Sequence, residues 1–474
     1  MSRRQGSPGA GVVIHDAANS LERLLGIPPG SGPGARSPAG MSSKSRSVVR
    51  ELLSAMSARL LVLPVAAVAA IFTTRLVNAA LGPQSFAVYS LVAGLPLLFA
   101  VADLGLGAAI TNSAAAATTD PARFLAILRR SLLISLFIAF LIAAASTLLG
   151  AMGLWPSLLG LSESELNAPI SLAMIVFAFA IPGGLGRAVL LGIGRYGPSV
   201  IIQGLTPVAS LGVVGVAIGL GTQTSGIVAV SSLGLFFVNW IGFLFAAVSL
   251  PGTWADYRRK PQRGVMGEVI RTSIPMLILV AGGSLLFQSG RLVLSHTSTL
   301  QQVAVYAALW TFFQPLLSVV QAVGLALWPR FAAARAAGRP IGSDFRAATL
   351  TSAMIGLCAG LGLTVFGPLA VRFATDGKIE VGILQCAILG AALLVQATML
   401  PAGMILTFPR GLWFQSITSW IAACIVVIIG ALASASLGAT APMLGLLAAI
   451  TIGQAIPTIA VAATFLDHRA PTQV

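Results

Sequence analysis

Two stretches of the sequence follow one pattern: TRLVNAALGPQSFAVY at Thr74–Tyr89 and GRLVLSHTSTLQQVAVY at Gly290–Tyr306. Both contain Arg-Leu-Val followed by Ala-Val-Tyr, and their arginines, Arg75 and Arg291, are 216 positions apart. An internal repeat of this length predicts a chain built from two similar halves.

The composition indicates which solvent surrounds those halves. The 474 residues are 57% hydrophobic and 9% charged, with a mean hydropathy of +0.94, whereas a soluble protein carries about 25% charged residues. A membrane-spanning helix needs about 20 mainly apolar residues. About twelve stretches qualify: 60–81, 86–111, 131–151, 169–193, 198–220, 226–250, 269–295, 302–327, 347–371, 381–407, 412–437 and 441–466.

The predicted fold is therefore an all-α polytopic membrane protein, with about 12 transmembrane helices in two pseudo-symmetric six-helix lobes around a central cavity. The repeat aligns the first two spans with the seventh and eighth. We expect a disordered cytoplasmic tail at 1–58, an N-lobe at 59–250, a cytoplasmic linker at 251–268, a C-lobe at 269–466 and a short cytoplasmic C-terminus at 467–474. The polar start of the chain has no early apolar run, so no cleaved signal is expected.

The net charge of +15 would suggest nucleic acid in a soluble protein, but here the basic residues follow the membrane sides. Most of the 28 Lys and Arg residues fall in loops on one side of the predicted spans. Arg372 and Lys378 lie on the other side, beside Asp376 and Glu380. Because Lys and Arg near span ends stay in the cytoplasm, both termini are predicted to be cytoplasmic, and nucleic acid is not an expected partner.

Motifs for chemistry are sparse. The three cysteines, Cys358, Cys386 and Cys424, lie in apolar runs without CxxC spacing, and no GxxxxGK[ST] stretch is present. The sequence predicts no catalytic residues, no metal site, no cofactor and no enzyme activity.

Four ionisable residues fall inside predicted spans, where a charge costs several kcal/mol unless it faces a cavity or a partner. Arg75 and Arg291 occupy matching positions near the outer ends of their helices, apart from any acid, and this suits an anionic headgroup in a central cleft. Snorkelling to the lipid headgroups is the alternative. Asp103 and Arg187 fall in the inner third of the first lobe and are predicted to form an ion pair or a gate.

Polar and aromatic residues in the spans are candidates for contacts with sugars. Gln288 is three residues from Arg291 and shares its helix face, while Gln314 and Gln321 share another face near Trp310. Gln396, Gln415, Asn239 and Trp240 complete this set. For any single glutamine, an interhelical hydrogen bond is the stronger alternative.

Two stretches resemble a known family. LGPQSFAVYSLVAGLPLLFAVADLGLGAAITNSAA at Leu81–Ala115 looks like the first helix hairpin of bacterial polysaccharide flippases, in the multidrug/oligosaccharidyl-lipid/polysaccharide exporter superfamily. LLGIGRYGPSVIIQ at Leu190–Gln203 is similar to that family's link between helices four and five. Here Thr111, Asn112 and Ser113 stand where the family often has a basic residue.

The resemblance implies alternating access of two lobes in the bacterial plasma membrane, moving a polyprenyl-pyrophosphate-linked oligosaccharide or related cell-envelope precursor to the outer leaflet. Its implied partners are this anionic lipid-linked glycan, membrane lipids and cell-envelope biosynthesis proteins. Two alternatives remain: a multidrug or cation antiporter of the same superfamily, which would need carboxylates in its cavity, and a membrane glycosyltransferase or ligase, which would need an acidic outer loop.

Overall fold

The computed structural model describes residues 43–99, 106–114, 117, 120–250, 265–336 and 342–467. The chain divides into two compact units, Met1–Arg50 and Glu51–Val474, and the account below concerns the second. Every regular element in these ranges is helical, so the predicted all-α fold is confirmed. Residues 1–42, 251–264 and 468–474 of the predicted tail, linker and C-terminus lie outside the described residues. Helix α2 begins at Ser43, inside the segment 1–58 that we predict to be disordered.

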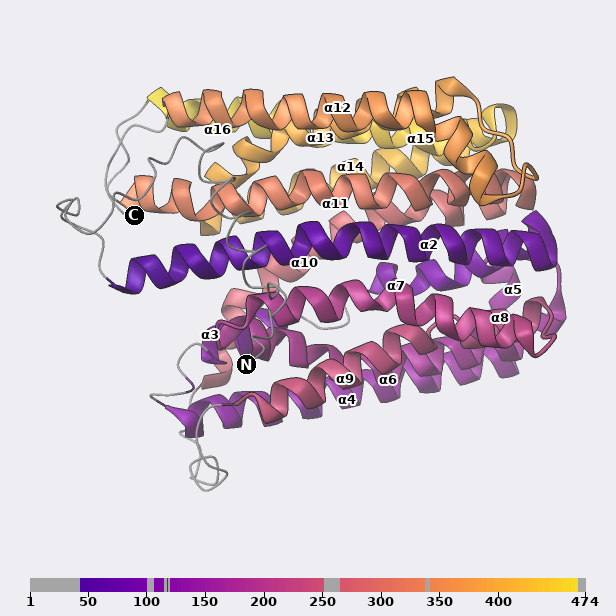
Figure 1. The fold of residues 1–474 in the computed structure, drawn as a ribbon, viewed down its shortest axis with the longest axis horizontal. Helices are drawn as coiled ribbons and strands as arrows, with labels where there is room; N and C mark the ends of the chain where they lie inside the picture. The colour runs from indigo at the N-terminus through magenta and orange to yellow at the C-terminus, as the bar shows by residue number, and fades with distance from the viewer. Residues whose placement is uncertain are drawn as a thin grey trace, which may run out of the picture. The chain divides into compact units, whose positions relative to one another are not determined.

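The helices follow the order of the predicted spans (Figure 1). Those of the first half are α2 (Ser43–Leu98), α3 (Leu106–Ala114), α4 (Pro121–Ala151), α5 (Trp155–Leu158), the 3₁₀ turn η2 (Ser164–Leu166), α6 (Asn167–Gly192), α7 (Tyr196–Gly219), α8 (Thr224–Val230) and α9 (Leu233–Val248). Those of the second half are α10 (Val265–Thr297), α11 (Leu300–Ala336), α12 (Gly342–Ala374), α13 (Ile383–Ile405), α14 (Pro409–Leu437), α15 (Thr440–Ala448), the π-helix η4 (Ala449–Ala455) and α16 (Ile456–Asp467).

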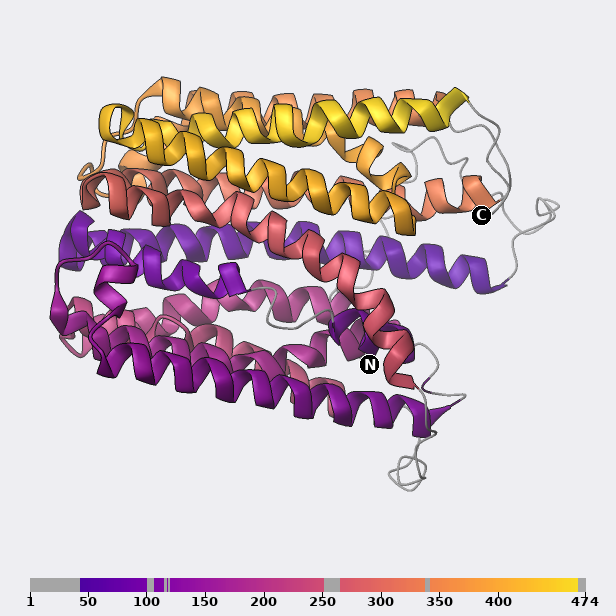
Figure 2. The ribbon, with the colours of Figure 1, turned by 180° about the vertical axis from the view of Figure 1, so that it is seen from behind.

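Within the described residues, 11 helices are long and apolar enough to cross a membrane. The first of them, Val62–Leu98, contains both the first predicted span and the start of the second. Gly82 divides it, because its backbone angles of φ 85° and ψ 174° are not helical, and the chain after Gly82 turns back along the bundle (Figure 2). The prediction of about twelve spans thus agrees with the structure, since one continuous element contains a hairpin.

Large apolar side chains on the outside of the bundle fit a lipid environment. Phe140 is 70% exposed, Leu432 80% and Val248 83%. Such a surface would promote aggregation in water, whereas hydrocarbon chains solvate it at no cost. Length, composition and surface therefore all indicate a multi-pass membrane protein.

Local sequence fixes several helix ends. Asp120 caps α4, its carboxylate accepting a hydrogen bond from the Arg123 backbone N–H at 3.0 Å, and Pro121 follows at the first helical position. Pro409 begins α14 in the same way, and Gly438, with φ 54°, follows its last residue. These caps keep the connections short, so consecutive helices pack against one another.

Each half has its own set of packed helices. In the first half α6 packs against α9, α4 and α3; in the second, α12 packs against α13 and α10 against α14. Helix α10 also contacts α3, because it crosses obliquely from the second half toward the first (Figure 2). This crossing helix contains Arg291.

The buried apolar residues form three clusters, and their locations differ. The largest contains residues of both halves, such as Phe177 with Trp310 and Leu389, and its first-half members lie near the end where α12 joins α13. We call this the Asp376 end of the bundle. At the opposite end the described residues form two separate cores, one of first-half residues such as Phe124 and one of second-half residues such as Leu406. The two halves therefore share a core toward the Asp376 end only, within the described residues.

The kink at Gly82 gives a test of the fold. A Cβ at Gly82 would meet no atom within 4 Å, so Gly82→Ala acts through the backbone alone. Because φ 85° with ψ 174° is essentially restricted to glycine, we expect this variant to lose about 1–3 kcal/mol of unfolding free energy. The measurement is thermal unfolding in detergent.

Gly212→Ala in α7 is the matched control, since its added Cβ also meets open space but its backbone is helical. Alanine is the better helix former by about 1 kcal/mol, so this variant should be as stable as the parent or more stable. Equal thermal unfolding midpoints for Gly82→Ala and Gly212→Ala would show that the backbone at position 82 accepts a side chain without strain, and would contradict the prediction.

Candidate functional site

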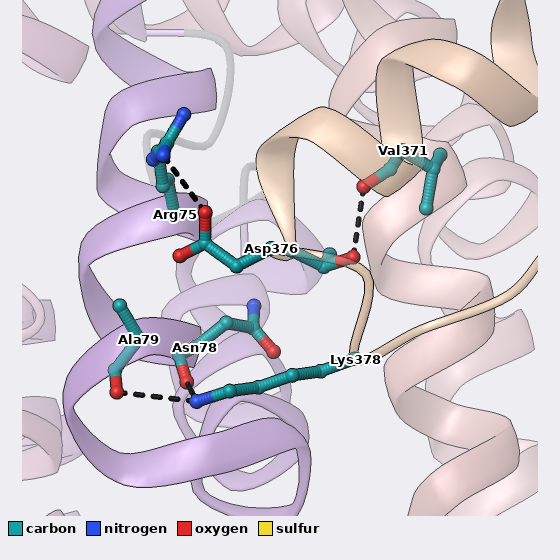
Figure 3. Close-up of polar contacts among 7 residues, drawn as sticks. Arg75, Asn78, Ala79, Val371, Asp376 and Lys378 are labelled. Carbon is teal, nitrogen blue, oxygen red and sulfur yellow. Dashed lines mark hydrogen bonds and ion pairs between the residues drawn. The ribbon is translucent and has the colours of Figure 1, made fainter.

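Arg75 lies in α2 near the Asp376 end and reaches across to the second half (Figure 3). One of its terminal nitrogens is 2.8 Å from the Asp376 carboxylate, and its guanidinium carbon is 4.7 Å from the centre of the Phe373 ring. The two charged side chains are 37% and 34% exposed, so water screens the pair in part. The expectation that Arg75 stands apart from any acid is wrong, because the acid comes from a turn between two helices of the opposite half.

That turn, residues 375–382, is held in one conformation by its own hydrogen bonds. The Thr375 hydroxyl donates to the Val371 carbonyl at 2.8 Å and accepts from the Ile379 backbone N–H at 3.3 Å. Asp376 has φ 50°, a left-handed conformation that few non-glycine residues adopt, although Asp tolerates it better than most. The turn is therefore shaped to present the Asp376 carboxylate toward α2.

Lys378 extends from the same turn to the same helix. Its ammonium donates to the carbonyl oxygens of Asn78 at 2.7 Å and Ala79 at 3.2 Å (Figure 3). These carbonyls belong to the last turn before Gly82, where the helix carries partial negative charge. Asp376 and Lys378 are two residues apart in one turn, and both bind α2. Asp376 binds the Arg75 guanidinium, and Lys378 binds two backbone carbonyls.

Arg291 has a different environment, although the repeat relates it to Arg75. Its guanidinium Nη1 donates to the backbone carbonyl of Ser90 in the first half at 2.9 Å, and Gly94 leaves room for that nitrogen, because a Cβ there would approach it to 3.1 Å. Its Nε is buried without a hydrogen-bond partner among the described residues. A half-buried cation whose Nε has no partner among the described residues costs free energy, which marks Arg291 as a candidate for ligand binding.

The Arg291 guanidinium lies beside Trp310, which packs against three other aromatic rings. The Arg291 guanidinium carbon is 6.0 Å from the Trp310 ring centre, and Trp310 stacks on Tyr306 with centroids 5.4 Å apart and planes at 17°. Phe313 lies 4.8 Å and Phe287 6.5 Å from Trp310 between ring centroids. We call Arg291, Ser90, Tyr306 and Trp310 the Arg291 cluster, a half-buried cation with flat apolar faces beside it.

Several predicted polar candidates near this cluster have unpaired buried atoms. Gln288 is 8% exposed, and the side-chain oxygens of Gln288 and Gln314 and the indole N–H of Trp310 have no partner among the described residues. Gln321, by contrast, is exposed on α11. The structure thus leaves Gln288, Gln314 and Trp310 able to bind a polar group, whereas Gln321 is not buried.

Three other candidates make interhelical hydrogen bonds, the alternative given above. Asn239 donates to the Ala180 carbonyl at 3.0 Å, and Trp240 donates to the Phe179 carbonyl at 2.9 Å. Gln415 donates to the Gly403 carbonyl at 3.3 Å. The oxygen of Gln396 is buried without a partner among the described residues.

The predicted contact between Asp103 and Arg187 stays a prediction. Asp103 lies outside the described residues, and Arg187 is partly buried in α6, where its backbone carbonyl accepts from the Ser199 hydroxyl at 3.4 Å.

Sequence reasoning missed Asp376 and Lys378 as residues that join the two halves. A signal was present, since both are in the predicted outer loop of the second half and Arg75 lies near the outer end of its helix. What the sequence lacks is the information that this loop lies against α2 and not another helix.

The comparisons with known proteins identify the fold. No protein-family model and no curated protein matches the chain. A solved inward-facing structure of a multidrug resistance MATE family transporter of the MOP superfamily matches with a TM-score of 0.67 and 16% identity, over 88% of this chain and 98% of that one. An outward-facing structure with the same description matches with a TM-score of 0.59 and 16% identity, over 90% and 97%. A eukaryotic MATE transporter matches with 0.58 and 15%, over 89% and 96%.

This chain therefore has the two-lobed fold of MATE transporters. The descriptions of the inward- and outward-facing structures name the superfamily that the sequence resemblance indicates, and they name multidrug resistance, not polysaccharides.

The partly buried charge of Arg291 gives a second test. Arg291→Met keeps an unbranched apolar side chain and removes the charge whose Nε is buried without a partner among the described residues, so we expect the unfolding free energy to rise by about 1–3 kcal/mol. Arg195→Met is the control, because Arg195 is exposed and should change stability by less than about 0.5 kcal/mol. Thermal unfolding in detergent measures both. A large loss of stability in Arg291→Met would show that the guanidinium holds the two halves together.

Proposed function

We propose that this protein is a membrane transporter that moves an amphipathic organic molecule by alternating access. The single observation that carries the proposal is the shared core: the halves pack together toward the Asp376 end and have separate cores at the other end of the described bundle. A core shared at one end and separate cores at the other, where α10 still contacts α3, is the arrangement that an alternating-access cycle reverses. The likeness to both inward- and outward-facing transporters supports it.

Charge supplies the proposed orientation. The basic loops lie at the end with separate cores, so we infer that this end faces the cytoplasm and that the Asp376 end faces outward. Both termini are then cytoplasmic, and the chain is in an inward-facing state in the plasma membrane of a bacterium.

A substrate of the kind that multidrug transporters carry is the first candidate, because the matched structures are described as such transporters. The Arg291 cluster narrows the chemical class of this substrate. A half-buried guanidinium favours an anionic group, and the faces of Trp310 and Tyr306 favour flat rings. We therefore propose an anionic or neutral aromatic amphiphile, in preference to the organic cation that a carboxylate-lined site would bind.

A polyprenyl-pyrophosphate-linked glycan is the second candidate. Arg291 favours it through the pyrophosphate, and the unpaired oxygens of Gln288 and Gln314 could accept hydrogen bonds from sugar hydroxyls. The sequence resemblance to polysaccharide flippases supports this candidate, with cell-envelope biosynthesis proteins as the partners it would bring.

Transport by the purified protein in lipid vesicles tests the proposal with three probes: an anionic xanthene dye, the cation ethidium, and a fluorescent polyprenyl pyrophosphate whose leaflet is read by chemical quenching. We expect movement of the anionic dye, or of the pyrophosphate lipid under the second candidate. Arg291→Gln should slow that movement at least about tenfold, the effect of losing a charged hydrogen bond of about 1.5 kcal/mol or more.

Arg195→Gln serves as the control, and its rate should match that of the parent. Movement of ethidium alone, unaffected by Arg291→Gln, would overturn the assignment of an anionic substrate. If the folded protein moves none of the three probes, the transporter proposal is contradicted for these substrate classes.

A further inference from the structure

At the Asp376 end, two sets of contacts join the halves crosswise. The first consists of Arg75, Asn78 and Ala79 on α2 against Asp376 and Lys378 of the second half. The second joins the end of α10 to the first half: the His296 ring is 3.3 Å from the Ser157 carbonyl, and a Cβ at Gly160 would overlap the Ser295 backbone.

The internal repeat relates these two sets. Helix α10 corresponds to the first part of α2, since both contain the Arg-Leu-Val stretch. The connection from α4 to α6, which contains Ser157 and Gly160, corresponds to the connection from α12 to α13, which contains Asp376 and Lys378. In each set, therefore, the first helix of one half contacts the connection after the third helix of the other.

The chemistry of the two sets differs. The residues named in the α10 set include no Arg, Lys or carboxylate, and the backbones pack closely where Gly160, with φ 65°, permits the approach. The α2 set is charged and about one-third exposed at Arg75 and Asp376. Charges at such exposure can be solvated again when the halves separate, whereas a close-packed backbone contact has no equivalent partner in water.

Buried contacts lie directly beside the charged set. Val77 and Ile379, which neighbour its residues in sequence, are fully buried, and the Thr74 hydroxyl is 3.3 Å from the Thr311 hydroxyl of α11 in the second half. Thr74 itself is 3% exposed. Separation of the α2 set would therefore admit water to an interface between the halves that is closed in this structure.

We propose that Arg75–Asp376, together with Lys378 on the α2 carbonyls, is a charge latch that keeps the outer end of the transporter closed and releases when the protein turns outward. This inference rests on the proposed function for its direction. It assigns Arg75 to gating, and leaves Arg291 as the arginine that is available to substrate.

Thiol labelling tests the latch. Thr74→Cys is introduced after Cys358, Cys386 and Cys424 are replaced by alanine, and a membrane-impermeant maleimide is added outside the vesicle. Asp376→Asn should raise the labelling rate about twofold to fivefold, the range expected for one partly exposed ion pair. The charge exchange of Arg75→Asp with Asp376→Arg should restore slow labelling.

Two controls separate the latch from general loosening. Glu380→Gln removes a carboxylate from the same turn at an exposed position, and it should leave the labelling rate of Thr74→Cys unchanged. Ser434→Cys reports on packing within the second half near the same end, because Ser434 is fully buried in α14, and Asp376→Asn should not raise its labelling.

Equal labelling of Thr74→Cys in Asp376→Asn and Glu380→Gln would overturn the latch. So would increased labelling at both reporter cysteines, or a charge exchange that labels as fast as Asp376→Asn. Labelling requires no substrate, so the expected pattern without movement of any probe would uphold the latch and count against the proposed substrates.

Discussion

Two six-helix halves held together at one end impose the main constraint on this molecule. In a bilayer every backbone N–H and C=O must be satisfied within the protein, so each half is a bundle of helices. The halves then meet through side chains and through backbone carbonyls that accept hydrogen bonds from side chains of the opposite half. One continuous core joins them toward the Asp376 end, and separate cores serve them at the other. The connections at the Asp376 end, the crossing of α10 and the polar contacts between the halves are arranged around that joint.

The polar residues between the two halves differ in their effect on the free energy of unfolding. Arg75 and Lys378 find acceptors at the rim, where water moderates both the gain and the loss of an interaction. Arg291 lies deeper, beside Trp310 and the Ser90 carbonyl, in a place where a charge lowers stability. Under the proposed function, a ligand explains why the half-buried Arg291 is retained, and a contact that breaks explains the partly exposed pair of Arg75 and Asp376.

Likeness to MATE transporters at 16% identity shows which features of the sequence carry the fold. Span length, span order and short connections are sufficient to specify twelve packed apolar segments, and many sequences satisfy them. Substrate choice depends on a few polar side chains in those spans, and these can change without altering the fold. The fold therefore gives the two-lobed helical architecture, while under the proposed function the Arg291 cluster is the part that bears on the substrate.

The sequence by itself determined the helical, two-lobed architecture, because apolar length and charge placement are local properties of the chain and the repeat from Arg75 to Arg291 is visible in the letters. It also identified Arg291, Gln288 and Trp310 as unusual residues for a membrane span. Only the tertiary structure decided their partners. Arg75 and Arg291 match in sequence, yet one meets a carboxylate and the other a carbonyl and an indole, since each reaches into the opposite half. Contacts between segments some 200 to 300 residues apart depend on how the halves dock, and no local pattern encodes that.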